Sequence, residues 1–177
     1  MIAHYKEIAS NTLLPIILYN VPSRTGLNIE PETCLALSKI PNIVGIKEAS
    51  GDISQVAKIS HLCGDNLWIY SGNDDQILPV LSLGGIGVIS VLSNILPKFV
   101  HNMVFDYLSG NFTLAKDSQI KAIPLIKNLF CEVNPIPIKS ALTKMGFSVG
   151  ETRLPLVPMS ELHEANLELE MRKFKLL

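Results

Sequence analysis

The stretch that decides the fold is GIKEASGD, residues 45–52, in which a short apolar run ends at two charged residues. Ile43 and Val44 precede it, so the run is apolar on both of its faces. Short runs of this kind are typical of buried strands in parallel sheets. Functional side chains gather where such strands end, and Lys47 therefore becomes the first candidate for chemistry.

Similar apolar runs occur on both sides of this stretch, at residues 13–18, 67–70 and 87–91. Helical patterns lie between the runs, and each is bounded by Pro, Asp or Gly. These patterns predict helices at residues 30–40, 52–63 and 74–83. Alternation of strand and helix with short links indicates parallel βαβ units with right-handed crossovers.

The chain becomes entirely helical in its pattern after Pro97. We expect helices at residues 99–108, 112–130, 137–145 and 160–173. The predicted domains are a βα portion at residues 1–110 and a helical extension at residues 111–177. The fold class is α/β, and two architectures fit the first portion: part of a (β/α)₈ barrel or a small doubly wound sheet.

The composition narrows the possible partners. The 177 residues carry a net charge of −1, which gives no electrostatic reason to expect nucleic acid or an anionic membrane. The uncharged stretch between Asp75 and Lys98 is interrupted by proline and glycine, so we expect no membrane span. Apolar residues make up 47% of the chain and charged residues only 18%, which favours an oligomer or a chain lacking part of its core.

Cysteine and histidine usage indicates neither disulfides nor a metal site. The three cysteines, Cys34, Cys63 and Cys131, are odd in number and far apart, as expected for reduced thiols in a cytoplasmic protein. The four histidines are isolated from one another, and we predict no metal ligands.

Three polar residues at or after strand ends could carry chemistry. A lysine desolvated at a strand end has its pKa lowered, and the neutral amine of Lys47 could then form a Schiff base with a ketone. Tyr19, at the end of the previous run, could relay protons, and Arg24 in the following loop could hold a carboxylate. The alternatives are a lysine paired with Glu48 or Asp52, a buried strand tyrosine and a solvated arginine.

Five segments together resemble the signatures of the dihydrodipicolinate synthase family, which belongs to the Schiff-base aldolases. They are YNVPSRTG at residues 19–26, GIKEASGD at 45–52, SGNDD at 71–75, GGIGVISV at 84–91 and EVNPIPIK at 132–139. The resemblance covers essentially the whole chain and implies a (β/α)₈ barrel. We therefore expect the C-terminal half of that barrel, strands five to eight, followed by a helical C-terminal extension.

The resemblance also implies a role for each candidate residue. Lys47 would form an imine with pyruvate, Tyr19 would relay protons, and Arg24 would hold the carboxylate of aspartate 4-semialdehyde. Gly72 and Ile89 would line the pocket with their backbone. The expected product is 4-hydroxy-tetrahydrodipicolinate, a precursor of diaminopimelate and lysine, made with no cofactor beyond the covalent pyruvate imine.

One departure from the family pattern is large. The family carries a Gly-Thr-Thr-Gly-Glu segment and a second relay tyrosine donated by a neighbouring subunit, and neither is present in this chain. The first helical pattern also lacks an N-cap residue. We therefore expect an incomplete site, and as partners either further copies, as in the tetramers of the family, or a complementary N-terminal half.

Two other functions stay open at this point. One is a related sugar-acid aldolase such as N-acetylneuraminate lyase, against which Arg24 argues. The other is a catalytically silent half-barrel that acts in assembly.

Overall fold

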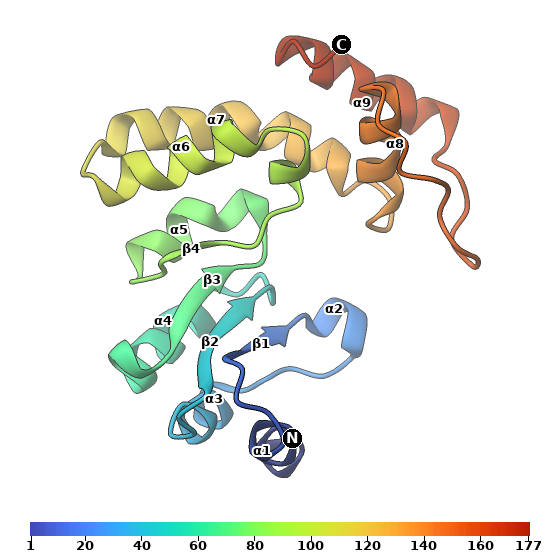
Figure 1. Cartoon of the computed structure of the whole chain (residues 1–177). Helices are drawn as coiled ribbons and strands as arrows, with labels where there is room; N and C mark the ends of the chain where they lie inside the picture. The colour runs from blue at the N-terminus through green and yellow to red at the C-terminus, as the bar shows by residue number, and fades with distance from the viewer. The chain divides into compact units, whose positions relative to one another are not determined.

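The computed structural model describes residues 1–177, which form two compact units, Met1–Ile89 and Ser90–Leu177. Unit 1 contains a parallel sheet and its helices, and unit 2 is helical (Figure 1). The α/β class and the parallel βα order predicted from the sequence are confirmed.

The sheet of unit 1 has four strands in the order β1-β2-β3-β4, and every pair is parallel. The strands are β1 (Ile16–Asn20), β2 (Ile43–Glu48), β3 (Trp68–Ser71) and β4 (Gly87–Val88). In the register, Tyr19 lies opposite Lys47, and Lys47 lies opposite Tyr70. The two predicted candidates at strand ends are thus direct neighbours across the sheet.

Helix α1 (Ile2–Ser10) precedes the first strand. The strands of unit 1 are connected by α2 (Pro22–Thr25), α3 (Pro31–Leu37), α4 (Ile53–Cys63), η1 (Gly64–Asn66), η2 (Asp74–Gln76) and α5 (Ile77–Ser82). Their starts and stops follow local chemistry. Pro31 occupies the first turn of α3, where no backbone donor is needed. The Asp52 carboxylate accepts the Ser54 N–H at 2.8 Å and caps α4, which ends at Gly64 with φ +50°.

The two faces of the sheet differ in burial. On one face Leu18, Ile46 and Ile69 belong to a buried core with residues of α3 and α4. On the other face Ile17 is 42% exposed, Tyr19 is 45% exposed, and Trp68 in β3 is 50% exposed. Because alternate residues of a strand point to opposite faces, each strand contributes to both surfaces. Unit 1 therefore presents an uncovered sheet face that is largely apolar.

The first and fourth strands are shorter than predicted. The first strand begins at Ile16, since Leu13 and Leu14 are exposed in the preceding turn. The fourth strand ends at Val88 and not at Val91. There the Ser90 hydroxyl accepts the Ser93 N–H at 2.8 Å, and the chain turns into η3 (Leu92–Asn94).

The short helix α2 was not expected either. It begins with Pro22 in its first turn and is closed by Gly26, whose φ of +68° belongs to the left-handed region that favours glycine.

Unit 2 consists of η3 and four longer helices: α6 (Pro97–Leu108), α7 (Phe112–Leu129), α8 (Ile136–Lys144) and α9 (Glu161–Lys173). The pair α6 and α7 forms a helical hairpin, and α9 packs against both α7 and α8 (Figure 1). The fully buried side chains of unit 2 include Met103, Leu125, Leu129, Leu167 and Met171. The four predicted helices of this region are thus present.

The boundary between the compact units lies at 89/90, some way before the domain boundary predicted at 110/111. The hairpin explains the difference, because α6 packs on α7 and both belong to unit 2. The division at 110 separates a barrel portion from an extension, and it stays a prediction. A bilayer-spanning helix is not found, since none of the helices combines the necessary length with the necessary hydrophobicity.

Candidate functional site

The carboxyl ends of the four strands are joined by backbone hydrogen bonds that continue the ladder past the strands. The bonds run from Ala49 N–H to Asn20 O (2.9 Å), from Gly72 N–H to Glu48 O (2.7 Å) and from Ile89 N–H to Ser71 O (2.9 Å). Tyr19, Lys47, Gly72 and Ile89 therefore lie at or just beyond one edge of the sheet. All four, and Arg24, belong to unit 1.

Lys47 and Tyr19 are in direct contact on the uncovered face. The Lys47 Nζ atom lies 4.2 Å from the centroid of the Tyr19 ring, within the range of a cation–π contact. Lys47 is half-buried and Tyr19 more exposed. The structure thus brings together the predicted nucleophile and the predicted proton relay.

The alternative in which Lys47 simply pairs with a nearby carboxylate is not what the structure has. Lys47 forms no salt bridge with Glu48 or Asp52. The Glu48 oxygens accept hydrogen bonds from two side-chain amides and a backbone N–H, and Asp52 caps α4. The Lys47 ammonium is consequently left without a carboxylate partner inside this chain.

Arg24 lies in α2, in the segment that links β1 to α3. Its side chain is exposed and forms no ion pair within the chain. A free guanidinium just beyond a strand end is available to a carboxylate ligand. The structure does not bring Arg24 into contact with Lys47 or Tyr19.

Gly72 must be a glycine because of a close approach between β3 and β2. A Cβ atom at this position would lie 2.6 Å from the Ala49 Cβ and 3.0 Å from the Glu48 carbonyl oxygen. Ile89, by contrast, follows β4 with a side chain that is 39% exposed. Both residues donate their backbone N–H groups to the neighbouring strand.

The sequence analysis missed a polar cluster behind the strand ends. Asn20, Glu48 and Gln55 are all at least 94% buried, and Asn28 joins them by hydrogen bonds. A signal was present: Asn20 and Glu48 follow apolar runs two positions after buried residues, which places them on the covered face. A polar residue on such a face needs buried partners.

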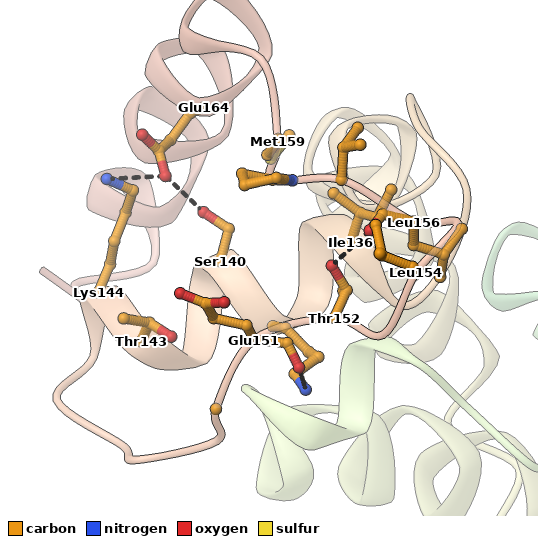
Figure 2. A pocket seen from close by; sticks show the side chains of 14 residues that line it. Ile136, Ser140, Thr143, Lys144, Glu151, Thr152, Leu154, Leu156, Met159 and Glu164 are labelled. Carbon is orange, nitrogen blue, oxygen red and sulfur yellow. Dashed lines mark hydrogen bonds and ion pairs between the residues drawn. The ribbon is translucent and has the colours of Figure 1, made fainter.

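A cavity of about 470 Å³ lies in unit 2, between α8, the loop at residues 150–159 and Glu164 (Figure 2). Its lysines are already engaged: Lys139 Nζ donates to the Glu151 carbonyl at 2.6 Å, and Lys144 Nζ pairs with Glu168 at 2.6 Å. The Glu168 hydrogen bond raises the pKa of Lys144. None of the candidate residues of unit 1 lines this cavity.

No group of three or more His, Cys, Asp or Glu side chains is arranged to hold a metal ion. The buried thiols of Cys34 and Cys63 lie in the core of unit 1, and burial raises the pKa of Cys34 to about 12.

Comparison with known proteins decides the family. The model of the dihydrodipicolinate synthetase family matches residues 1–173. The chain belongs to this family. The resemblance predicted from five sequence segments is confirmed, and the family assignment accounts for their common order along the chain.

Members of the family match closely but are longer. The 4-hydroxy-tetrahydrodipicolinate synthase of Caldicellulosiruptor saccharolyticus is 62% identical over 161 residues, which are 91% of this chain and 54% of that protein. The dihydrodipicolinate synthase structure from Thermotoga maritima is 44% identical with a TM-score of 0.96. The match covers 99% of this chain and 61% of the T. maritima chain. The chain thus spans little more than half the length of these relatives.

A third relative was solved with a ligand. The chloride-inhibited dihydrodipicolinate synthase from Acinetobacter baumannii, complexed with pyruvate, is 38% identical with a TM-score of 0.95. The match covers 99% of this chain and 60% of the A. baumannii chain. In this chain the family segments YNVPSRTG and GIKEASGD end two neighbouring strands of one parallel sheet.

Proposed function

We propose that this chain carries the nucleophilic half of a lyase that condenses pyruvate with aspartate 4-semialdehyde. The observation that carries the proposal is Lys47, which lies near the carboxyl end of β2 on the uncovered face of the sheet, in contact with Tyr19 and without a carboxylate partner. An amine free of ion pairs at a strand end is placed to attack a ketone. Membership of the family supports the choice of pyruvate as that ketone.

The chemistry begins when the neutral Lys47 amine adds to the pyruvate ketone carbon. Loss of water gives an imine, and loss of a proton from the methyl group gives the enamine. The enamine carbon then bonds to the aldehyde carbon of aspartate 4-semialdehyde, whose oxygen takes up a proton. The amino group of the semialdehyde finally displaces Lys47 from the imine carbon, which closes the ring and returns the free lysine.

The other candidate residues serve this sequence of steps. Tyr19, in contact with Lys47, moves protons to and from the carbinolamine and the aldehyde oxygen. The exposed Arg24 guanidinium binds the carboxylate of the semialdehyde. The backbone at Gly72 and Ile89 forms the wall of the pyruvate site. No external cofactor is needed, because the imine itself is the electron sink.

We further propose that the sheet of unit 1 is the C-terminal half of a (β/α)₈ barrel, strands five to eight, with residues 111–177 as its helical extension. The exposed face at Ile17, Tyr19 and Trp68 supports this, because the interior of such a barrel is filled by side chains from the strands. The strands β1 and β4 at the two edges of the sheet would each pair with a strand of the other half.

The same uncovered face favours a second candidate function, a silent half-barrel that acts in assembly. The two functions differ in whether Lys47 is needed. Binding of this chain to the N-terminal half of a relative, measured by analytical ultracentrifugation, tests the half-barrel itself. A chain that stays monomeric and ignores the added half would contradict it.

The proposed activity is tested by turnover of pyruvate with aspartate 4-semialdehyde, first in the chain alone and then with the added half. Lys47→Arg should abolish turnover. Lys58→Arg, which changes an exposed lysine on α4, should not alter it. Turnover of N-acetylneuraminate in place of the semialdehyde would identify a sugar-acid aldolase. Turnover that survives Lys47→Arg would contradict the proposal.

A further inference from the structure

Glu48 is a buried carboxylate with no cation beside it. The residue is only 3% exposed, and its carboxyl group faces hydrogen-bond donors. Oε2 accepts from Asn20 Nδ2 at 2.9 Å and from Gln55 Nε2 at 3.2 Å, and Oε1 accepts from Ser50 N–H at 2.7 Å. Glu48 thus supplies the acceptor for three donors, and an apolar residue in its place would leave these donors without that partner.

The donors around Glu48 belong to a network that ties four segments together. Asn20 Nδ2 also donates to Asn28 Oδ1 at 2.8 Å, while Asn20 Oδ1 accepts the Ile29 N–H at 2.9 Å. Asn28 Nδ2 donates to Gln55 Oε1 at 2.6 Å. The network thus connects the end of β1, the segment after α2, the end of β2 and the first turns of α4.

The network lies directly behind the proposed reacting groups. Asn20 and Glu48 point to the covered face of the sheet, and their preceding residues, Tyr19 and Lys47, point to the uncovered face. A single peptide unit joins Asn20 to Tyr19, and another joins Glu48 to Lys47. Fixing the backbone at 20 and 48 therefore fixes the two Cα atoms from which the tyrosine ring and the lysine amine extend.

We propose that Glu48 is the positioning residue for Lys47, and that the network of Asn20, Asn28, Glu48 and Gln55 aligns Lys47 with Tyr19 for imine formation. This inference rests on the proposed function. Glu48 acts through the backbone and contacts no substrate. Because Asn28 also anchors the end of the segment that carries Arg24, the same network helps to place the guanidinium that would bind the semialdehyde carboxylate.

The substitution Glu48→Gln keeps the shape of the side chain but replaces one of its two acceptor oxygens with an NH₂ donor. The donors of Asn20 and Ser50 are held by backbone constraints: Asn20 cannot reverse its amide without losing the Ile29 N–H, and Ser50 offers a main-chain N–H. An introduced amide satisfies one of them and points its own NH₂ at the other. We expect the end of β2 to shift, and a shift of about 1 Å costs about 100-fold in rate.

The experiment measures the rate of pyruvate trapping by borohydride in the chain combined with the added N-terminal half of a relative. At saturating pyruvate, Glu48→Gln should slow trapping at Lys47 by about 10- to 100-fold, with little change in the half-saturating pyruvate concentration. Gln55→Met removes one donor to Glu48 and should give a smaller loss in the same direction. It serves as the test if Glu48→Gln does not fold.

The matched control is Asn42→Ala, just before the other end of β2. Asn42 Nδ2 donates to the Ala9 and Thr12 carbonyls at 3.0 Å each, so its loss also removes a half-buried side-chain contact that holds this end of the strand. At an equal drop in thermal midpoint, Asn42→Ala should leave the saturated trapping rate unchanged. A merely structural role for Glu48 would slow both variants alike.

The outcomes separate this inference from the proposed function. No adduct in the unsubstituted protein means that the proposed function itself is wrong. An adduct that forms at the same saturated rate in folded Glu48→Gln and Gln55→Met overturns the positioning role and leaves the lyase intact. Equal slowing by Asn42→Ala overturns it as well.

Discussion

Replacement of Gly72 by alanine tests the joint between β2 and β3 on which the site is built. The added Cβ would lie 2.6 Å from the Ala49 Cβ, whereas carbon atoms pack at about 3.5–4.0 Å. The two strand ends must therefore separate by about 1 Å. Neither contact is the tip of a flexible side chain, because the Glu48 carbonyl oxygen lies at 3.0 Å and the Ala49 Cα at 3.2 Å.

Two costs add up in Gly72→Ala. Overpacking a well-filled site costs about 1–3 kcal/mol. Separation of the strands also lengthens the 2.7 Å hydrogen bond from Gly72 N–H to the Glu48 carbonyl, which is worth about 1 kcal/mol. We expect the free energy of unfolding to fall by about 2–4 kcal/mol.

Urea denaturation followed by circular dichroism measures this loss. The matched control is Gly87→Ala in β4, where the new Cβ would meet the Tyr70 ring at 3.6 Å, an ordinary contact. Gly87→Ala should change the free energy of unfolding by less than about 1 kcal/mol. Equal, small effects of the two substitutions would refute the close approach at Gly72.

Three further predictions concern single side chains. Tyr19→Phe keeps the ring against Lys47 but removes the hydroxyl, and it should slow imine trapping by about 100-fold or more; an unchanged rate would exclude the proton relay. Burial raises the pKa of Cys34 to about 12 from 9.0, so its contribution to stability is complete below pH 9.0 and is lost as the pH rises towards 12. Thermal midpoints across that range should fall in the unsubstituted protein and less so in Cys34→Ala. Hydrogen bonds from His163 and Ser160 lower the pKa of Glu132, so its contribution is present above pH 4.5 and lost as the pH falls through the lowered value. Glu132→Gln should remove that part of the acid dependence of the thermal midpoint, and an identical acid profile would contradict the contact.

The strand-end residues could be predicted because parallel strands impose a simple rule. An apolar run that stops at Lys47 places that lysine at the carboxyl edge, and the run before Tyr19 places the tyrosine beside it. Their contact at 4.2 Å follows from the register of neighbouring strands. The register of parallel strands thus places two residues that are far apart in the sequence next to each other in space.

Glu48 shows where the sequence is insufficient. As a charged residue next to Lys47, it suggests an ion pair, yet it points to the opposite face and binds amides 28 and 7 residues away in the chain. Such partners are set by the packing of β1 and α4 against β2. The end of the fourth strand is similar, because a single Ser90 hydroxyl turns the chain into η3 within an otherwise unbroken apolar run.

The central claim is that Lys47 forms the imine with pyruvate. The most direct measurement is borohydride reduction of the chain, combined with the added N-terminal half of a relative, in the presence of pyruvate, followed by peptide mass spectrometry. We expect one reduced pyruvate on the peptide that contains Lys47, and no adduct in Lys47→Arg. An adduct on another lysine, or one that persists in Lys47→Arg, would contradict it.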